Sequence, residues 1–168
     1  MILSVADAKA HLRVDGADDD ALITSLIEAA IDHVEGFTGL TLEPREIEEA
    51  AAGFGGRLGT WPVREITSVS YRDGSGAEQQ LADGAWWANL ASRPLRLNPV
   101  GSGWPALGGG SAPVTVTMQA GYEEGEVPAG IVQALKMIVR HFYDDQDGKT
   151  DMPGAIAALL RPHRLERV

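Results

Sequence analysis

Carboxylates are the residues of this chain with the most evident capacity for chemistry, and they are dense near its start. Asp15 and residues 18–20 place four acidic side chains within six positions, which would suit a hard cation such as calcium. The alternating frame of a calcium loop, with its glutamate at the twelfth position, is missing. Adjacent aspartates also suit the start of a helix, where the helix dipole favours negative charge. We therefore expect helix-start charge here and no metal site.

Other catalytic and cofactor patterns are missing from the sequence. The four histidines show no close metal-binding spacing, and the chain has no cysteine. No serine stands in a nucleophile elbow, and no glycine-rich loop has the pattern that holds a phosphate or a dinucleotide. Glu46, Glu48 and Glu49 are the remaining candidates, because paired carboxylates can act as acid and base. We predict that the protein is not an enzyme and has no cofactor, with a carboxylate-based hydrolase as the last alternative.

Composition and charge narrow the functional classes further. A length of 168 residues predicts one soluble folded domain, and no segment is apolar enough to cross a membrane. The net charge is −10, of which residues 1–50 carry −9 through twelve acids and three bases. Binding to DNA phosphates requires clustered Lys and Arg, so we expect DNA to be repelled rather than gripped. The absence of cysteine and of a signal peptide predicts assembly in a reducing cytoplasm.

Helical periodicity marks the N-terminal part of the chain. Ser4 and Asp7 have the spacing that satisfies free amides at a helix start, and this first helix should end at residues 15–16. A second helix should follow from Asp18, because apolar residues recur at helical spacing from there to Gly39. Gly39 is its expected C-terminal stop.

Helical periodicity returns in the C-terminal part. Pro128 is expected in the first turn of the clearest helix. The apolar residues on one face of this helix include Ile131, Leu135, Ile138 and Phe142. A short last helix is expected over residues 153–160, ended by Pro162.

The middle of the chain, from about residue 41 to residue 121, lacks the helical period and predicts β structure. Strands are expected at 46–51, 57–63, 66–72, 79–81, 85–90, 94–97 and 114–120. Residues 73–76 predict a hairpin turn, and the glycine-rich residues 101–111 predict an exposed, mobile loop around Trp104. Adjacent Trp86 and Trp87 must point to opposite faces of a strand. Either both anchor interfaces, or one lies in the core and the other is half exposed.

These elements predict an α+β fold in which N-terminal and C-terminal helices form a small bundle with a β-rich insertion between them. We expect residues 1–168 to form a single domain. Its parts would be helical over 1–40, β-rich over 41–121 and helical again over 122–168.

The order of several short motifs resembles a known family. After the acidic first helices and the β-rich insertion come Ala120-Gly121-Tyr122, Val127-Pro128 and the ending Leu159-Leu160-Arg161-Pro162-His163-Arg164. This arrangement resembles the head-tail connector (adaptor) family of tailed phages, in the long form that also occurs in gene transfer agents. The order and separation of these short patterns reinforce one another.

The resemblance implies a structural virion protein that performs no chemistry. Connector subunits join into a ring, typically dodecameric, that lies beneath the portal, links capsid to tail and extends the DNA channel. The implied partners are the portal protein, a downstream neck or tail-completion protein and further copies of the chain, with DNA passing through without sequence-specific binding. The protein would be assembled in the host cytoplasm and located in the virion neck. The runner-up is a small cytoplasmic oligomeric binding module unrelated to virions.

Candidate residues follow for each implied contact. The predicted portal-binding residues are Ile156, Leu159, Leu160, Arg161, Pro162, His163, Arg164 and Arg167. The predicted channel-facing residues are Asp18, Asp19, Asp20, Glu28, Asp32 and Glu35. The predicted subunit-interface residues are Trp86, Trp87, Ile131, Leu135, Ile138 and Phe142. The last helix is too short to be stable alone, so it needs a partner surface. That surface is either the portal or the subunit's own helical core.

Overall fold

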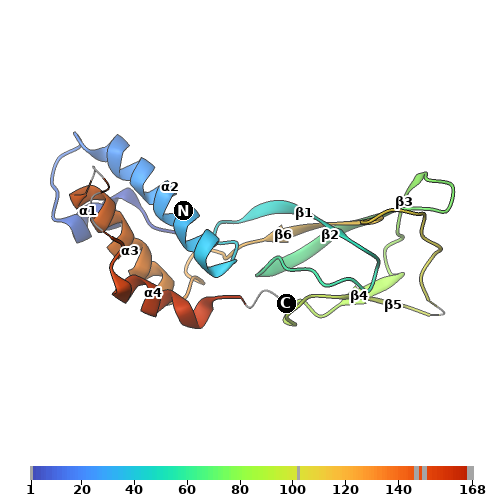
Figure 1. The fold of residues 1–168 in the computed structure, drawn as a ribbon. Coiled ribbons are helices and arrows are strands. Elements are labelled where there is room, and N and C mark those ends of the chain that lie inside the picture. The colour runs from blue at the N-terminus through green and yellow to red at the C-terminus, as the bar shows by residue number, and fades with distance from the viewer. Residues whose placement is uncertain (1, 102, 146–147, 149–150, 166–168) are drawn as a thin grey trace. The chain divides into compact units, whose positions relative to one another are not determined.

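The computed structural model describes residues 2–101, 103–145, 148 and 151–165. The chain divides into two compact units (Figure 1). Residues 1–43 and 122–168 form a helical unit, and residues 44–121 form a β unit. The predicted α+β fold, with a β-rich insertion between helical ends, is confirmed. Whether both units work as a single connector domain stays a prediction.

The helical unit begins with α1 (Val5–Leu12) and α2 (Asp20–Thr38). The sequence predicted both helices, but α1 ends at Leu12, before the expected residues 15–16, and Arg13 already adopts the left-handed conformation with a φ of 62°. α2 starts two residues after the expected Asp18. Ser4 caps α1, because its Oγ accepts a hydrogen bond from the Asp7 amide at 3.0 Å. Gly39 ends α2 with a φ of 77°, a left-handed conformation that glycine adopts without strain. Local sequence signals therefore determine where α1 starts and where α2 ends.

The second half of the helical unit consists of α3 (Ala129–Asp144) and α4 (Gly154–Leu160), followed by a 3-10 turn (Arg161–His163). α3 packs against both α2 and α4. The last helix predicted over residues 153–160 agrees with α4, which ends at Leu160, and Pro162 lies within the 3-10 turn that follows. A proline is tolerated there since the first amides of a helical turn have no partner within it.

The β unit contains a four-stranded antiparallel sheet in the order β1-β6-β2-β3. Its strands are β1 (Arg45–Ala51), β2 (Val63–Arg72), β3 (Glu78–Gln80) and β6 (Val114–Ala120). A separate hairpin pairs β4 (Trp86–Ala88) with β5 (Leu97–Pro99). The predicted turn at residues 73–76 connects β2 and β3. Alternate residues of β6, from Val114 to Ala120, are fully buried, so this central strand supplies much of the core.

The predicted strand at residues 57–63 is wrong. Only Leu58 makes an isolated bridge, to Leu95, and Val63 already belongs to β2. The amides of Gly59 and Thr60 bond instead to the carboxylate of Glu49, at 2.7 and 3.0 Å. A side chain thus satisfies backbone groups that a neighbouring strand would otherwise bind.

The glycine-rich loop is irregular, as predicted, but it is not simply exposed. Trp104 is half-buried and stacks on Phe54 with ring centroids 4.6 Å apart. The Gly108 amide donates to the Arg72 carbonyl at 2.8 Å. A Cβ atom at Gly108 would lie 2.3 Å from the Asp73 carbonyl oxygen, so this close approach requires glycine. The loop is therefore tied to the end of β2.

Candidate assembly surfaces

The last helix packs on the subunit's own core. Ile156 is 1% exposed and Leu160 is 0% exposed, and α4 contacts α3 and α2. The expectation that Ile156 and Leu160 fill a portal groove is therefore corrected, because their surface is already covered within the chain. Leu159 lies between them in sequence and is half-buried, so it keeps surface for a partner.

The chain beyond α4 runs along the C-terminal end of α2. The Leu165 amide donates to the Thr38 carbonyl at 2.7 Å, and the Arg164 guanidinium lies 5.5 Å from the Phe37 ring centroid. His163 is half-buried beside Gly130 of α3. Three of the predicted portal-binding residues are exposed: Arg161, Pro162 and Arg164. Arg167, also predicted for this contact, lies outside the described residues.

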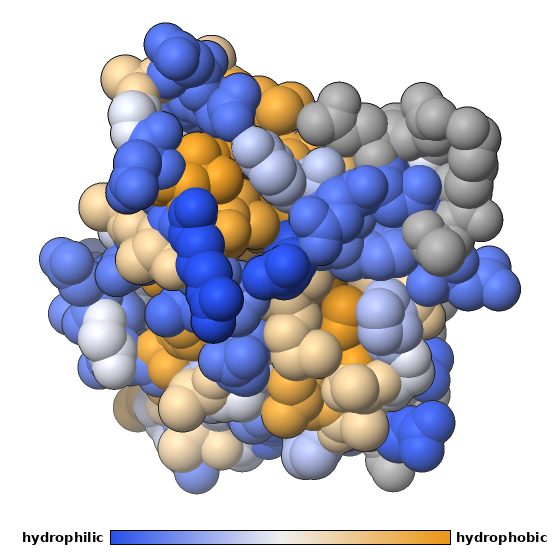
Figure 2. Space-filling view, turned by 90° about the vertical axis from the view of Figure 1, so that its left-hand side faces the viewer, coloured by the Kyte–Doolittle hydropathy of each residue, from blue (hydrophilic) through white to orange (hydrophobic). Residues whose placement is uncertain are grey.

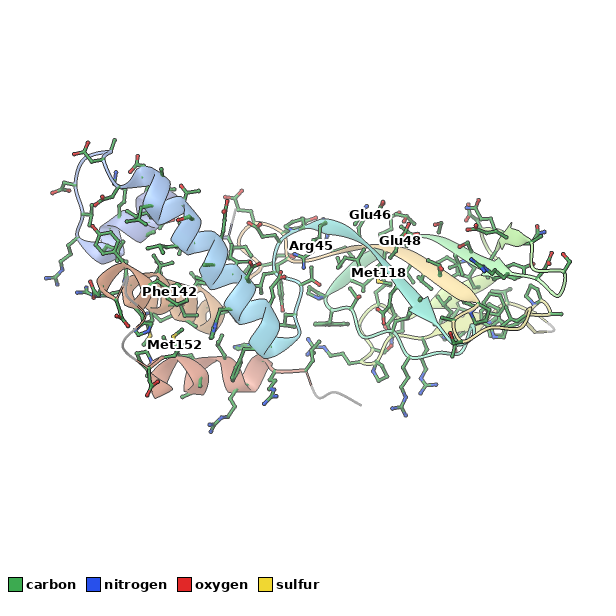
Figure 3. All side chains as sticks on the ribbon, turned by 45° about the horizontal axis from the view of Figure 1, so that its top comes forward. Arg45, Glu46, Glu48, Met118, Phe142 and Met152 are labelled. Atoms are coloured by element: carbon green, nitrogen blue, oxygen red, sulfur yellow. The ribbon has the colours of Figure 1, made fainter. Side chains whose placement is uncertain are left out.

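The predicted interface residues of α3 are mostly core residues. Ile131, Leu135 and Ile138 are fully buried in the helical unit, so they cannot contact a neighbouring subunit without unfolding, and that expectation is corrected. Phe142 remains half-buried on α3 (Figure 3). Figure 2 shows a face of the molecule on which hydrophilic side chains surround smaller apolar areas.

The two adjacent tryptophans point to opposite sides of the β4–β5 hairpin, as predicted. Trp86 packs against the core of the β unit, whereas Trp87 is 54% exposed. The buried Trp86 Nε1 has no hydrogen-bond partner among the described residues. Of the two, only Trp87 offers a large surface to another molecule.

Three of the predicted channel-facing acids have partners within the helical unit. Asp20 forms an ion pair with Lys9 at 2.6 Å. Asp19 accepts a hydrogen bond from the Tyr143 hydroxyl at 2.7 Å, which raises the tyrosine pKa because the ionised phenol would lose that bond. Glu35 accepts the Leu42 amide at 2.6 Å. These acids hold the fold together.

The other three predicted channel-facing acids are Asp18, Glu28 and Asp32, and all are exposed. Glu28 and Asp32 lie four residues apart on α2, so they share one face of the helix. The helical unit holds seventeen acids and eight bases, a net charge of −9, whereas the β unit has a net charge of −1. Negative charge is therefore a property of the helical unit.

No constellation of side chains indicates metal or acid–base chemistry in the part of the chain that the structure describes. There, no three His, Asp or Glu side chains are grouped as ligands of a metal ion. Glu46 and Glu48 are exposed on the outer face of β1, on either side of the half-buried Ile47. The Glu49 carboxylate binds Gly59 and Thr60. No described helix is long and apolar enough to cross a bilayer.

Sequence reasoning missed the outer faces of the β unit. Arg57 and Arg96 are exposed, and each directly precedes a buried leucine. Thr115 and Thr117 alternate with buried residues of β6. This two-residue period could have identified both sets as outward-facing.

The N-terminal part of the chain matches the model of a phage protein family. Residues 2–54 match the family model described as phage gp6-like head-tail connector protein. This region contains α1, α2 and β1. No curated protein matches the chain.

Solved structures of gene transfer agent (GTA) particles match nearly the whole chain. A chain of the neck of an empty GTA particle, computed with C6 symmetry, is 25% identical, with a TM-score of 0.77. A chain of the virion of a native GTA particle is 28% identical, with a TM-score of 0.78. A chain of the neck of a native GTA particle, computed with C12 symmetry, is 27% identical, with a TM-score of 0.76. Each match covers 99% of this chain and 91% of the other. The resemblance predicted from the sequence is confirmed.

Proposed function

We propose that this chain, which resembles the gp6-like head-tail connectors, is a structural virion protein that forms a ring in the neck of a tailed phage or gene transfer agent. The match to GTA neck chains carries the proposal, because it covers 99% of this chain and includes both the helical unit and the β unit. Connectors act by holding other proteins in place. No chemical step is assigned to this chain.

The ring would contain twelve copies. One similar neck structure has C12 symmetry and another has C6 symmetry, and a twelve-membered ring is compatible with both. A closed ring needs two different surfaces on each subunit, each complementary to the other. Negative-stain microscopy and sedimentation of the purified protein, with and without portal protein, would test this. A stable closed dimer at all concentrations would contradict it.

The portal contact is assigned to the exposed part of the C-terminal segment. Arg161 and Arg164 are exposed on and just after the 3-10 turn, where guanidinium groups can reach carboxylates or carbonyls of a partner. Half-buried Leu159 supplies apolar surface beside them. The buried side chains of Ile156 and Leu160 anchor this segment to the helical core.

Charge reversal tests this contact better than deletion of residues 156–168, which would remove buried core residues. We expect Arg161→Glu with Arg164→Glu to fold normally and to lose co-sedimentation with portal protein. Arg140→Glu is a control, since Arg140 is another exposed arginine of the helical unit and pairs with Asp144 one turn along α3. Portal binding equal to that of the unchanged protein would exclude the segment as the docking element.

The exposed acids of the helical unit would lie near the DNA channel. Like charges repel at distances up to roughly the Debye length, about 10 Å in moderate salt, so Glu28 and Asp32 would keep DNA mobile. Glu28→Lys with Asp32→Lys should increase DNA retention on purified rings, most strongly at low salt. Unchanged retention would show that these acids only contribute to solubility.

A further inference from the structure

The β unit has two outer faces on opposite sides of one core. The core joins residues of the four-stranded sheet, such as Val116 and Met118, to residues of the hairpin layer, such as Leu95 and Leu97. We call the solvent side of the four-stranded sheet the sheet face. We call the solvent side of residues 54–61 and 85–100 the hairpin face. Because both layers cover the same core, the two faces point away from each other.

The sheet face is polar and mainly acidic. Glu46, Glu48, Glu65 and Glu78 are exposed there, with Arg72 opposite Glu78 in the strand pairing. A shallow groove of about 570 Å³ crosses this face. The groove is lined by Glu48, Ser68, Ser70, Glu78, Gln79, Gln80, Thr115 and Thr117. Its lining contains carboxylates, hydroxyls and amides but no base. Figure 3 shows Glu46 and Glu48 on β1, along the edge of this sheet.

The hairpin face is basic and carries the most exposed apolar side chains. Arg57, Arg93 and Arg96 are exposed there. Residues 54–61 and 85–100 contain no acid, and the exposed Asp83 lies two residues before the second of these ranges. Trp87 and Val100 are the two large hydrophobic residues of the described chain that are more than half exposed, at 54% and 56%.

Trp87 and Val100 lie on the same side of the hairpin. Trp87 pairs with Asn98, and the Val100 amide donates to the Ala85 carbonyl at 2.9 Å. Residues two apart on a strand share a face, so Trp87 and Val100 are diagonal neighbours. An exposed indole on the same face as exposed arginines is the composition expected at the centre of a protein interface.

We propose that the hairpin face of one copy docks on the sheet face of the next copy, so that the β units form their own closed belt within the ring. This inference rests on the proposed function, because it needs neighbouring copies. The charges favour this pairing: a basic face meets an acidic face, whereas two hairpin faces or two sheet faces would repel. The pairing joins unlike surfaces, which is the arrangement that closes a ring instead of a dimer. Trp87 and Val100 would lie over the groove lined by Glu48 and Glu78.

Paired charge reversals test the belt. The first variant combines Arg57→Glu with Arg96→Glu, and the second combines Glu48→Lys with Glu78→Lys. Each should raise the protein concentration needed for ring formation by about tenfold or more, since each converts exposed attractions into repulsions at every contact. The four substitutions together restore complementarity and leave the net charge at −10, so they should restore ring formation. Ring formation is measured by sedimentation velocity and negative-stain microscopy.

Two further variants distinguish loss of this interface from general effects of net charge and of stability. Glu124→Lys with Asp151→Lys changes the net charge as much as the second variant but lies in the helical unit, so rings should form normally. Trp87→Ala removes an exposed side chain and leaves no cavity, so it should weaken rings while the melting temperature stays unchanged.

The outcomes distinguish the belt from the ring itself. Normal rings from both reversed pairs, or no recovery with all four substitutions in a chain whose melting temperature is unchanged, would overturn the belt. Failure of the unchanged protein to form rings with or without portal would overturn the proposed function instead.

Discussion

Replacing Leu160 by alanine tests whether the last helix belongs to the helical core. Leu160 is 0% exposed, and α4 packs against α3. Removing a buried leucine side chain costs about 2–5 kcal/mol, because lost apolar contacts are joined by the cost of a cavity. For a chain of 168 residues we expect the melting temperature to fall by roughly 5–15 °C.

The assay is thermal unfolding followed by the helical circular dichroism signal. All four tryptophans lie in residues 44–121, so their fluorescence reports separately on the β unit. Leu159→Ala is the matched control: it removes the same atoms from a half-buried neighbour and should cost clearly less. If both variants lose equal stability, α4 is not packed as described, and its apolar stripe would again be a candidate for the portal groove.

Three further predictions concern polar contacts. Hydrogen bonds from the side chains of Ser75 and then Gln79 lower the pKa of Asp73 to about 2. The β2–β3 turn should therefore keep full stability above about pH 4 and lose it as pH falls toward 2, which carboxyl titration by NMR would follow. Tyr143→Phe should lower the helical melting temperature by a few degrees below pH 10, and the difference should shrink above it, because the folded-state tyrosine pKa is raised. Glu49→Ala should cost about 1–3 kcal/mol in tryptophan-detected unfolding by urea, and no loss would show that water replaces its carboxylate.

Local signals made the helical ends and the central strand predictable. Ser4 caps α1 and Gly39 ends α2 because both functions depend on the residue itself and its immediate neighbours. The alternation from Val114 to Ala120 located β6 with its bounds, since every second residue is buried. Such features need no information about the rest of the fold.

The sequence did not show which elements pack against one another. The period of α3 shows that Ile131 and Leu135 lie on an apolar face, but it cannot show whether that face is covered by α2 and α4 or by another subunit. The same ambiguity applied to Ile156 and Leu160 of α4. Residues 57–62 failed as a strand because the distant Glu49 carboxylate binds the amides of Gly59 and Thr60, a contact that leaves no local pattern. The role of the outward-facing residues of a strand is hard to predict until the core-facing side of the sheet is known.

Electron microscopy of the purified chain mixed with portal protein tests the central claim most directly. We predict rings with twelve-fold symmetry seated on the portal, each copy presenting the helical unit and the β unit in the same way around the ring. Monomers or closed dimers at every concentration, with no density added to the portal, would contradict the proposal that this chain is a connector.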